Sequence, residues 1–563
     1  MEVIKHDVVV FGAGATGLRA AVEAQRFGKN VAVVSKVHPM RVQTVMATSL
    51  NAAFREGDNW EDHVFDTVKG SDYLGDEDGI AYLCEHGKED TLELERFGIM
   101  FTRDETGGYR KKGSGSGGQR FPRSIFTADR TGHTIVRTLY GYLQQTGVTI
   151  YDEWFVTKIV TKDNAVCGLT CINLRDGELY FIETKVVVVC TGGYGQVFYP
   201  RSTNALNTTG DGMALALQAG ARLLDMEFVQ FHPTSLLGTS ILMSEACRVA
   251  GAYLFNRHGE RFMQKHAEKM ELATRDVVSR GIQAEIDEGN GIDGKEYVHL
   301  DLRHLGEKKI MQFLPKNREL ALQYVGRDMI NSPIPIHPAQ HYSMGGIEVT
   351  IDGETSVRGL LAAGEAACVS IQGANRLGGN SVLETIVFGK RSGAHAAQVA
   401  QERAGETCSA REEVVAEAVR LKELLRKKGT ENGVVLKREL GKVMNSHVGI
   451  FRTAEDITKG LPLVKELQAR TQALTINQNS FLFNSELVDF LELENMTRLA
   501  EIIATCALAR EESRGSHYRR DFPNRDDEKW GCHSVVKLDG QGGFELGTKP
   551  VTRIKHMPAV RTY

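Results

Sequence analysis

Residues 7–17 read DVVVFGAGATG, an almost wholly apolar run that passes into a glycine-rich turn. An amphipathic run follows at 18–27, Gly28 ends it, and a second apolar stretch occupies 31–34. Short apolar runs on either side of a helical pattern indicate two buried strands joined by a helix. The sequence therefore predicts a βαβ unit in this region.

The turn of this unit carries Gly12, Gly14 and Gly17 in a GxGxxG pattern. Between a strand and a helix, the first glycine permits the tight turn and the second lets a pyrophosphate approach the backbone. The third lets helix and strand pack closely, and the phosphates meet the helix N-terminus. Ser35-Lys36 stands where an acid usually binds the ribose of NAD, which weakens an NAD interpretation but not an FAD one.

Later segments strengthen the FAD interpretation. Thr191 and Gly192 follow another apolar strand pattern, and Asp211 lies in a second glycine turn, so both segments would close over the cofactor. Glu365 would offer a carboxylate to its hydroxyl groups. Each residue alone is more often a turn or cap residue. With the GxGxxG pattern, they predict a Rossmann-like FAD-binding domain.

The pattern changes along the chain. Mixed short helices and strands replace the glycine turns from about 236 to 339, and a helical pattern dominates after about 396. The predicted class is α/β, with a discontinuous FAD-binding domain, an inserted α+β capping domain, a helical domain and a C-terminal tail domain. The predicted bounds are 1–235 and 340–395 for the FAD-binding domain and 236–339 for the capping domain. They are 396–510 for the helical domain and 511–563 for the tail domain.

Two shorter predictions accompany these bounds. Residues 156–173 alternate as a β-ribbon does, and residues 410–428 follow an amphipathic helical pattern with a charged face. The tail beyond residue 511 is polar and Arg-rich, with little periodicity.

Composition limits the classes of function. The 563 residues are 42% hydrophobic and 25% charged, with a formal net charge of −4. This balance offers neither a basic footprint for nucleic acid nor a polybasic anchor for lipid. No stretch approaches the roughly 18 apolar residues of a membrane span, and no leader pattern precedes the first strand. We expect a cytoplasmic protein that does not bind nucleic acid.

The nine cysteines contain no CxxC pair. Buried, reduced thiols are the expectation, with no metal site. Iron–sulfur clusters, if electrons pass to them, would have to belong to another chain.

Six motifs lie within the inserted region or in the segments that flank it. They are QFHPT (230–234), SEACR (244–248), NRHGERF (256–262), TRDVVSR (274–280), HYSMGG (341–346) and GANRLGGNS (373–381). In this order they resemble the succinate dehydrogenase/fumarate reductase flavoprotein family, which also includes L-aspartate oxidase. The resemblance covers nearly the whole chain, including residues 511–527 and the Arg561-Thr562-Tyr563 end.

The family's substrate is a C4 dicarboxylate, whose two charges need cations and hydrogen-bond donors at both ends. The resemblance implies that Arg376 and His341 bind one carboxylate. His232 and Ser244, with Thr234 nearby, would hold the other. The central carbon–carbon bond of the substrate would then lie against flavin N5, where hydride transfer takes place.

The resemblance also implies a proton shuttle. Arg275 would exchange the proton at the second carbon, although its ordinary pKa exceeds about 12. Another cation would have to depress that pKa, and Glu245 and Arg248, three residues apart, would relay the proton. Arg261 and Arg280 would be structural. The implied cofactor contacts are Gly12, Ala13, Gly14, Ala15, Gly17, Ser35, Lys36, Gln43, Thr44, Thr191, Gly192, Asp211, Glu365, Ser381 and Val382.

The sequence departs from the family at the flavin. Respiratory members carry Arg-Ser-His-Thr, whose His is bonded to the flavin, where this chain has Gln43. We therefore expect non-covalent FAD. Because the covalent bond raises the flavin potential in the family, its loss should favour fumarate reduction or require other tuning of the flavin. Other departures are Ser49-Leu50 beside the ring, Ser235 after the His-Pro-Thr motif, and Val249-Ala250 after the relay arginine.

The leading interpretation is a respiratory flavoprotein subunit on the cytoplasmic side of the membrane. Its implied partners are an iron–sulfur subunit and a quinone-binding membrane anchor, with haem as a further candidate in those partners. A soluble enzyme like L-aspartate oxidase is the second interpretation. A non-catalytic nucleotide-binding or assembly subunit is the third, and the intact set of charged residues weighs against it.

Overall fold

The computed structural model describes residues 1–54, 56–112, 118–128, 130–408 and 410–561, so Thr562 and Tyr563 of the family-like end lie outside the described residues. The predicted βαβ unit forms the middle of a five-stranded parallel sheet. Every residue of β2, β3 and β11 is buried, as parallel strands covered on both faces require. In spatial order the strands are β18 (Leu360–Ala362), β11 (Val186–Val189), β2 (Val8–Phe11), β3 (Val31–Ser35) and β7 (Thr149–Asp152).

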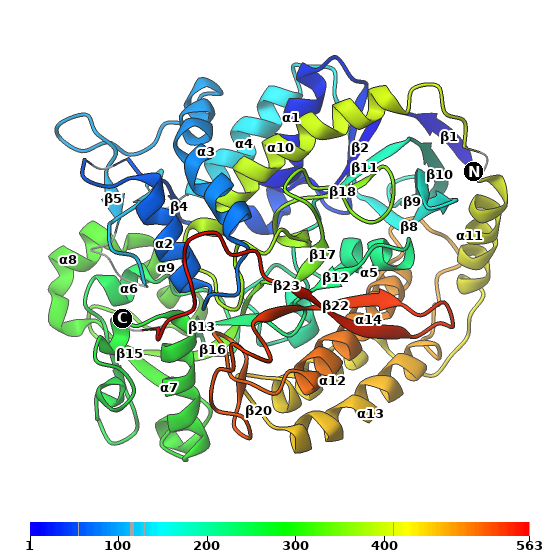
Figure 1. Ribbon diagram of the computed structural model, residues 1–563. Coiled ribbons are helices and arrows are strands. Elements are labelled where there is room, and N and C mark those ends of the chain that lie inside the picture. Colours follow the sequence, from blue (N-terminus) through cyan, green and yellow to red (C-terminus); the bar gives the residue numbers. More distant parts are fainter. Residues whose placement is uncertain (55, 113–117, 129, 409, 562–563) are drawn as a thin grey trace.

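Helices cover one face of this sheet and a second sheet covers the other (Figure 1). The helices are α1 (Ala15–Arg26), α4 (Thr131–Leu143) and α10 (Asn380–Glu402). The second sheet is β1 (Glu2–Lys5), β10 (Glu178–Glu183), β9 (Ala165–Asn173) and β8 (Trp154–Lys162). The β8–β9 pair is the ribbon expected at 156–173, and that prediction is confirmed.

The region that we name the capping segment, residues 236–339, has a hydrophobic core of its own, whose buried residues run from Leu236 to Ile336. Its antiparallel sheet consists of β13 (Val229–Leu236), β16 (Ile334–Ser343), β15 (Val298–Asp301) and β14 (Tyr253–Phe255). Its helices are α6 (Ala246–Val249), α7 (Arg275–Asp287), α8 (Gly306–Phe313) and α9 (Pro315–Val325). Because β13 and β16 continue into the α/β part, they carry residues from both sides of the boundary.

Helices between the sheets and the surface complete the α/β part. They are α2 (Trp60–Gly70), α3 (Glu77–Arg96) and α5 (Asp211–Gln218). A small sheet joins β4 (Leu50–Asn51), β6 (Ser124–Ile125) and β5 (Lys111–Lys112).

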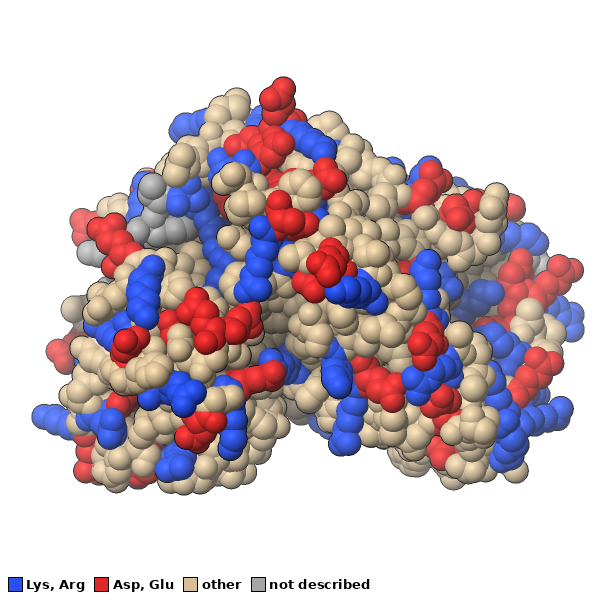
Figure 2. All heavy atoms as spheres, turned by 90° about the horizontal axis from the view of Figure 1, so that it is seen from below, with Lys and Arg blue, Asp and Glu red and all other residues tan. Residues whose placement is uncertain are grey.

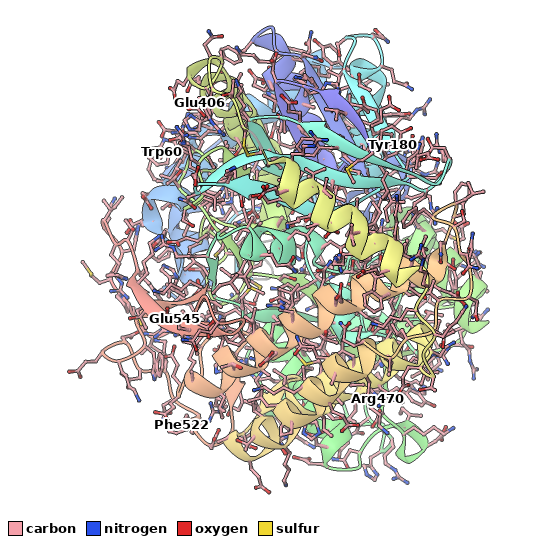
Figure 3. The ribbon with its side chains drawn as sticks, turned by 90° about the vertical axis from the view of Figure 1, so that its right-hand side faces the viewer. Trp60, Tyr180, Glu406, Arg470, Phe522 and Glu545 are labelled. Atoms are coloured by element: carbon pink, nitrogen blue, oxygen red, sulfur yellow. A yellow bond between two sulfur atoms is a disulfide. The ribbon has the colours of Figure 1, made fainter. Side chains whose placement is uncertain are left out.

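After α10 the chain is mainly helical, as predicted. The helices are α11 (Arg411–Leu424), α12 (Gly433–His447), α13 (Ala454–Thr471) and α14 (Ser485–Ala509). Figure 3 shows α11, α13 and α14 stacked on one side, with Arg470 on α13, and Glu545 at the opposite edge. The helix predicted at 410–428 is present but stops at Leu424.

The segment after α14 contains a β-hairpin that the sequence did not reveal. Strand β22 (Cys532–Leu538) pairs with β23 (Phe544–Pro550) and joins a sheet with β12 (Leu223–Leu224), β17 (Gly346–Glu348) and β19 (Ala367–Cys368). Five of the seven residues of β23 are exposed and none is buried, so no apolar alternation marks this strand in the sequence.

The expectation of nine reduced thiols is wrong at two positions. The structure joins Cys167 of β9 to Cys408 by a disulfide, with Cα atoms 5.6 Å apart. The two residues are 241 positions apart in sequence, and only the packing of the segment after α10 against β9 brings them together. The other seven cysteines are free.

Surface charge is mixed. Figure 2 shows acidic and basic side chains interspersed over one face, with a deep notch between two lobes. Among the helices in the described ranges, none combines the length and apolarity of a membrane span.

Candidate active site

A cavity of about 930 Å³ runs from the glycine turn after β2 to the capping segment. Gly12, Gly14 and Thr191 line one end of it. Arg275 and Arg376 line the other end. Residues predicted for the cofactor and for the substrate therefore share one continuous space.

At the first end, the backbone needs glycine. Gly12 has φ +116°, and a Cβ there would lie 2.3 Å from the carbonyl oxygen of Cys190. A Cβ on Gly17 would lie 1.9 Å from the carbonyl oxygen of Gly12, so this glycine serves helix–strand packing and does not line the cavity. Ala15 also lies outside the cavity wall, although its N–H donates to Thr44 Oγ1 at 3.3 Å.

Lys36 lines the cavity, but its ammonium is held by protein groups. Nζ donates to Thr209 Oγ1 and Asp211 Oδ2 at 2.6 Å, and to Glu492 Oε1 at 2.8 Å. Burial lowers the pKa of Lys36, but the two carboxylates outweigh it and raise this pKa to about 12. Glu492 comes from α14, so the helical segment helps to shape this wall.

Several groups at this end fit a bound dinucleotide. The hydroxyl Oγ1 of Thr191 is buried and has no hydrogen-bond partner. Gly192 next to it has φ +75° and open space within 4 Å of where a Cβ would lie. Ser381 and Val382, in the first turn of α10, also line the cavity, so a helix N-terminus faces the same space. The residues present therefore fit FAD.

The cavity wall includes Glu365, a carboxyl group whose pKa is raised. Glu365 Oε1 accepts the N–H of Ser343 at 3.0 Å. Burial is the largest effect on this group and raises the pKa of Glu365 to about 7. Gln43 also lines the cavity, and its Oε1 accepts the N–H of Ala205 at 2.6 Å.

At the far end, one neutral amide connects the two arginines. Gln230 Oε1 accepts Arg275 Nη1 at 3.1 Å and Arg376 Nη2 at 3.2 Å. Arg376 also donates to Ser381 Oγ. Burial, together with the charge of Arg275, lowers the pKa of Arg376 to about 10. Two guanidinium groups therefore meet without a carboxylate between them.

Two histidines lie beside these arginines, with ring centroids 5.0 Å apart. Burial and the charge of Arg275 lower the pKa of both His232 and His341 well below the ordinary value, so both rings are neutral. The N–H of Thr234 donates to His232 Nδ1 at 3.2 Å. The carbonyl oxygen of Thr234 lies at the same distance from Nδ1, and Nε2 is buried with no hydrogen-bond partner among the described residues. His341 Nδ1 lies 2.7 Å from the hydroxyl of Thr203.

The predicted relay residues are in contact. Arg275 Nη2 donates to Glu245 Oε2 at 3.0 Å, and Arg248 Nη2 lies 3.8 Å from Glu245 Oε1. Burial alone would raise the pKa of Glu245, but Arg275 and Arg248 outweigh it and lower that pKa. Arg248 is 2% exposed and lies behind Glu245, away from the cavity wall. Burial lowers its pKa.

Comparisons with known proteins show the family of this chain. The model of the FAD binding domain matches residues 7–382, and that of the fumarate reductase flavoprotein C-terminus matches residues 437–563. The succinate dehydrogenase flavoprotein subunit of Rickettsia conorii is 40% identical over 97% of this chain and 95% of its own length. This chain belongs to the succinate dehydrogenase/fumarate reductase flavoprotein family.

Other members of the family are equally similar. The 8-methylmenaquinol:fumarate reductase flavoprotein subunit of Wolinella succinogenes is 42% identical over 97% of this chain and 90% of its own length. A quinol fumarate reductase chain of E. coli superposes with a TM-score of 0.96 and 38% identity, covering 100% of this chain and 99% of its own. As a family member, the chain is an FAD-dependent oxidoreductase.

One predicted substrate residue does not reach the cavity of this flavoprotein. Thr234 is fully buried, and its hydroxyl donates to the carbonyl of Met243 at 2.7 Å. Its backbone N–H and carbonyl oxygen both lie 3.2 Å from His232 Nδ1. Ser244 does line the cavity, and its N–H donates to Asn317 Oδ1 at 3.0 Å.

Sequence reasoning missed two residues of the flavoprotein site. Gln230 stands in the quoted QFHPT motif but received no role. Tyr342 stands in HYSMGG, and its ring lies 4.3 Å from the guanidinium carbon of Arg376. Its hydroxyl donates to the buried Glu384 at 2.9 Å. Their positions next to assigned residues were the only available signal.

Proposed function

We propose that this flavoprotein interconverts succinate and fumarate. The main support is the charge at the far end of the cavity, where Arg275 and Arg376 share one neutral acceptor and two neutral histidines lie beside them. A C4 dicarboxylate would supply negative charge to Arg376, for which no ion pair is found among the described residues, and further negative charge to Arg275, which already contacts Glu245.

The proposed binding mode uses both ends of the substrate. Arg376 and His341 bind one carboxylate. His232, through Nε2, which has no partner among the described residues, binds the other carboxylate together with Ser244. Fixing both ends places the central carbon–carbon bond against the cofactor end of the cavity, and such orientation is a large part of catalysis.

The proposed proton path uses Arg275, Glu245 and Arg248. FAD, when bound, supplies the hydride chemistry. Arg275 gives a proton to the second carbon in fumarate reduction and removes it in succinate oxidation. Glu245 connects Arg275 to Arg248, and Arg376 shares the acceptor Gln230 with Arg275.

Substitution of Arg275 tests this function. We expect Arg275→Gln to lower kcat for fumarate reduction by about 1,000-fold, within the range typical of general acid catalysis, with FAD still bound. Arg303→Gln is the matched control, because Arg303 pairs with Asp301 on the surface of the same segment. Assays would use a reduced dye as electron donor.

Parallel assays separate the competing functions. Hydrogen peroxide formation from L-aspartate without fumarate turnover would replace the proposal with an oxidase. Wild-type protein that carries FAD but converts none of these substrates would refute it outright. Substantial fumarate turnover by Arg275→Gln would show that Arg275 is not the proton shuttle.

We further propose that FAD is bound without a covalent bond. Gln43 occupies the position of the linking histidine, and its amide is held by Ala205. The nearest alternative in sequence, His38, accepts the N–H of Met40 at 3.2 Å and does not line the cavity.

Acid precipitation checks the flavin linkage. We expect all flavin to stay in the supernatant, because nothing holds it once the protein unfolds. A yellow, fluorescent pellet would show a covalent bond and overturn this part of the proposal.

Without covalent attachment the flavin potential should be low, which favours fumarate reduction over succinate oxidation. Rates in both directions, measured on one preparation with dyes of matched potential, check this bias. A faster rate of succinate oxidation would contradict it.

We propose that electrons are exchanged with a separate iron–sulfur subunit, and through it with a quinone-binding membrane anchor on the cytoplasmic side. Within the described ranges, no group of His, Cys, Asp and Glu could hold a metal ion. Copurification of tagged protein from its native membrane, followed by iron analysis, tests the assembly.

A further inference from the structure

Residues 551–561, which we name the strap, run from β23 back across the molecule to the capping segment (Figure 1). The N–H of Thr552 donates to Asp76 Oδ1 at 2.6 Å. Glu77 Oε2 then accepts the N–H groups of residues 554, 555 and 556 at 2.7–3.1 Å. The strap is therefore fixed to the start of α3 before it reaches the capping segment.

At its far end the strap contacts helix α7. Arg561 Nη2 donates to Asp276 Oδ2, and Arg280 Nη2 donates to the same oxygen at 3.2 Å. The side chain of Asp276 is fully buried. Its pKa falls to about 2, because Arg561 and Arg280 outweigh the effect of burial. Asp276 therefore stays ionised, and the guanidinium groups of Arg561 and Arg280 balance its buried charge.

Arg561 also faces the α/β part. Its Nη1 lies 3.9 Å from Asp72 Oδ2, in the turn between α2 and α3. Asp72 is held in place by Arg525 Nη1 at 2.9 Å and by the N–H of Gly515 at 2.8 Å. One guanidinium thus lies between a carboxylate of the capping segment and a carboxylate of the α/β part.

The residue next to Asp276 is Arg275, whose position leaves little freedom. A Cβ on Gly378 would lie 2.8 Å from Arg275 Nη2, so this guanidinium rests on the backbone before α10. Its other contacts are Glu245 and Gln230. A displacement of about 1 Å at a reacting group can cost about 100-fold in rate.

We propose that Arg561 is a positioning residue for the reaction. By holding Asp276 it fixes the first turn of α7, and with it Arg275, relative to the α/β part that binds the cofactor. This inference rests on the proposed role of Arg275. Arg561 itself does not line the cavity.

Substitution of Arg561 should slow proton transfer and leave the binding of substrate and FAD nearly unchanged. We expect Arg561→Ala to lower kcat for fumarate reduction by about 10- to 100-fold, with KM changed less than about threefold and FAD content unchanged. The solvent deuterium isotope effect on kcat should rise, because delivery of the proton becomes the slow step. Arg561→Lys keeps the charge but not the fork of donors, so it should recover part of the rate.

Arg520→Ala is the matched control. Arg520 comes from the same C-terminal region and donates to Asp287 Oδ2 at 2.6 Å, at the other end of α7. This pair is about half exposed, whereas Asp276 is buried. We expect its kcat and isotope effect to match those of the wild type. The nearly isosteric Asp276→Asn should reproduce the effect of Arg561→Ala from the partner side.

The outcomes are distinct. Arg561→Ala with wild-type kcat and isotope effect would overturn the inference. So would an equal loss in Arg520→Ala, because general loosening of α7 would then explain both results. Loss of kcat with an unchanged isotope effect would also overturn it. A wild-type protein without fumarate turnover would instead refute the proposed function.

Discussion

Gln230 shows how a single neutral residue can hold a cationic site together. Its amide oxygen accepts from both arginines, and its Nε2 donates to the carbonyl of Arg376 at 2.8 Å. A carboxylate at this position would neutralise the charge intended for the substrate. An amide orients the cations and leaves them available for a dianion.

Replacing Gln230 by Leu removes this shared acceptor at nearly constant size. We expect kcat/KM for fumarate to fall by about 100-fold, because hydrogen bonds to charged groups contribute about 1.5–3 kcal/mol each. Steady-state kinetics with flavin quantification checks the effect. Gln283→Leu, on the outer face of α7, should behave as wild type. Normal kinetics in Gln230→Leu would mean that the arginines need no bridge.

Histidine chemistry at this site was predictable only in part. The motif order indicated His232 as a substrate ligand. Its Nδ1 contacts the backbone of Thr234, two residues away, in the bulged strand β13, and Nε2 is left without a partner among the described residues. Thr234 was expected at the substrate, but its side chain is turned into the capping core. The direction of a side chain at a bulge is not encoded in a motif.

At the scale of elements, the cofactor turn depends on how closely α1 and α10 pack. A Cβ on Gly393 would lie 2.3 Å from the carbonyl oxygen of Ala20, and one on Gly389 would lie 2.8 Å from that of Thr16. Two glycines four residues apart on α10 therefore let the helices touch through their backbones. Because α1 begins at the GxGxxG turn, its position sets that of the phosphate site.

Gly393→Ala should therefore weaken FAD binding. The added methyl group has no room, so α1 must move away from α10, and we expect at least about a tenfold loss of FAD affinity. Gly141→Ala is the control, because Gly141 lies inside α4 with nothing within 4 Å of its would-be Cβ. That change should be neutral or slightly stabilising. Fluorescence titration of apoprotein with FAD measures both, and equal affinities would contradict the packing argument.

Elements were predictable where periodicity was strong. The strands and helix of the βαβ unit, and the β8–β9 ribbon, follow from buried apolar runs and alternation. The hairpin β22–β23 does not, since most of its second strand faces solvent. The Cys167–Cys408 disulfide was missed because no spacing rule connects residues on different elements.

At the scale of the whole molecule, one buried histidine ties three parts of the chain together. His533 of β22 lies between Asp225, with Nδ1–Oδ2 2.7 Å, and Asp76, with Nε2–Oδ1 3.1 Å. Burial lowers the pKa of His533, but the two carboxylates outweigh it and raise this pKa to about 10. Asp76 precedes α3 and also holds the strap through Thr552.

The stabilisation from His533 should disappear in alkali. Since its folded pKa lies above the ordinary value of 6.5, the contribution is complete below about pH 6.5 and is lost as pH rises through about 10. We expect His533→Gln to cost about 3 kcal/mol near pH 6, because two buried carboxylates lose their cation. The cost should shrink towards pH 10.

Thermal unfolding of wild type and variant across this pH range checks the trend. His395→Gln is the control, because His395 pairs with the half-exposed Glu354 and surface pairs contribute at most about 1 kcal/mol. A destabilisation by His533→Gln that does not change with pH would show that charge is not the cause.

The sequence by itself determined the family, the dinucleotide turn and the identity of most charged residues at the reacting end. Such features depend on local backbone needs, such as the positive φ of Gly12, or on motifs whose members lie close in the chain. The tertiary structure alone decided that Glu492 pairs with Lys36, that Gln230 bridges Arg275 and Arg376, and that Arg561 reaches Asp276. Interactions of this kind join side chains that only packing brings into range, and hydrogen bonds and buried charges act over a few ångströms.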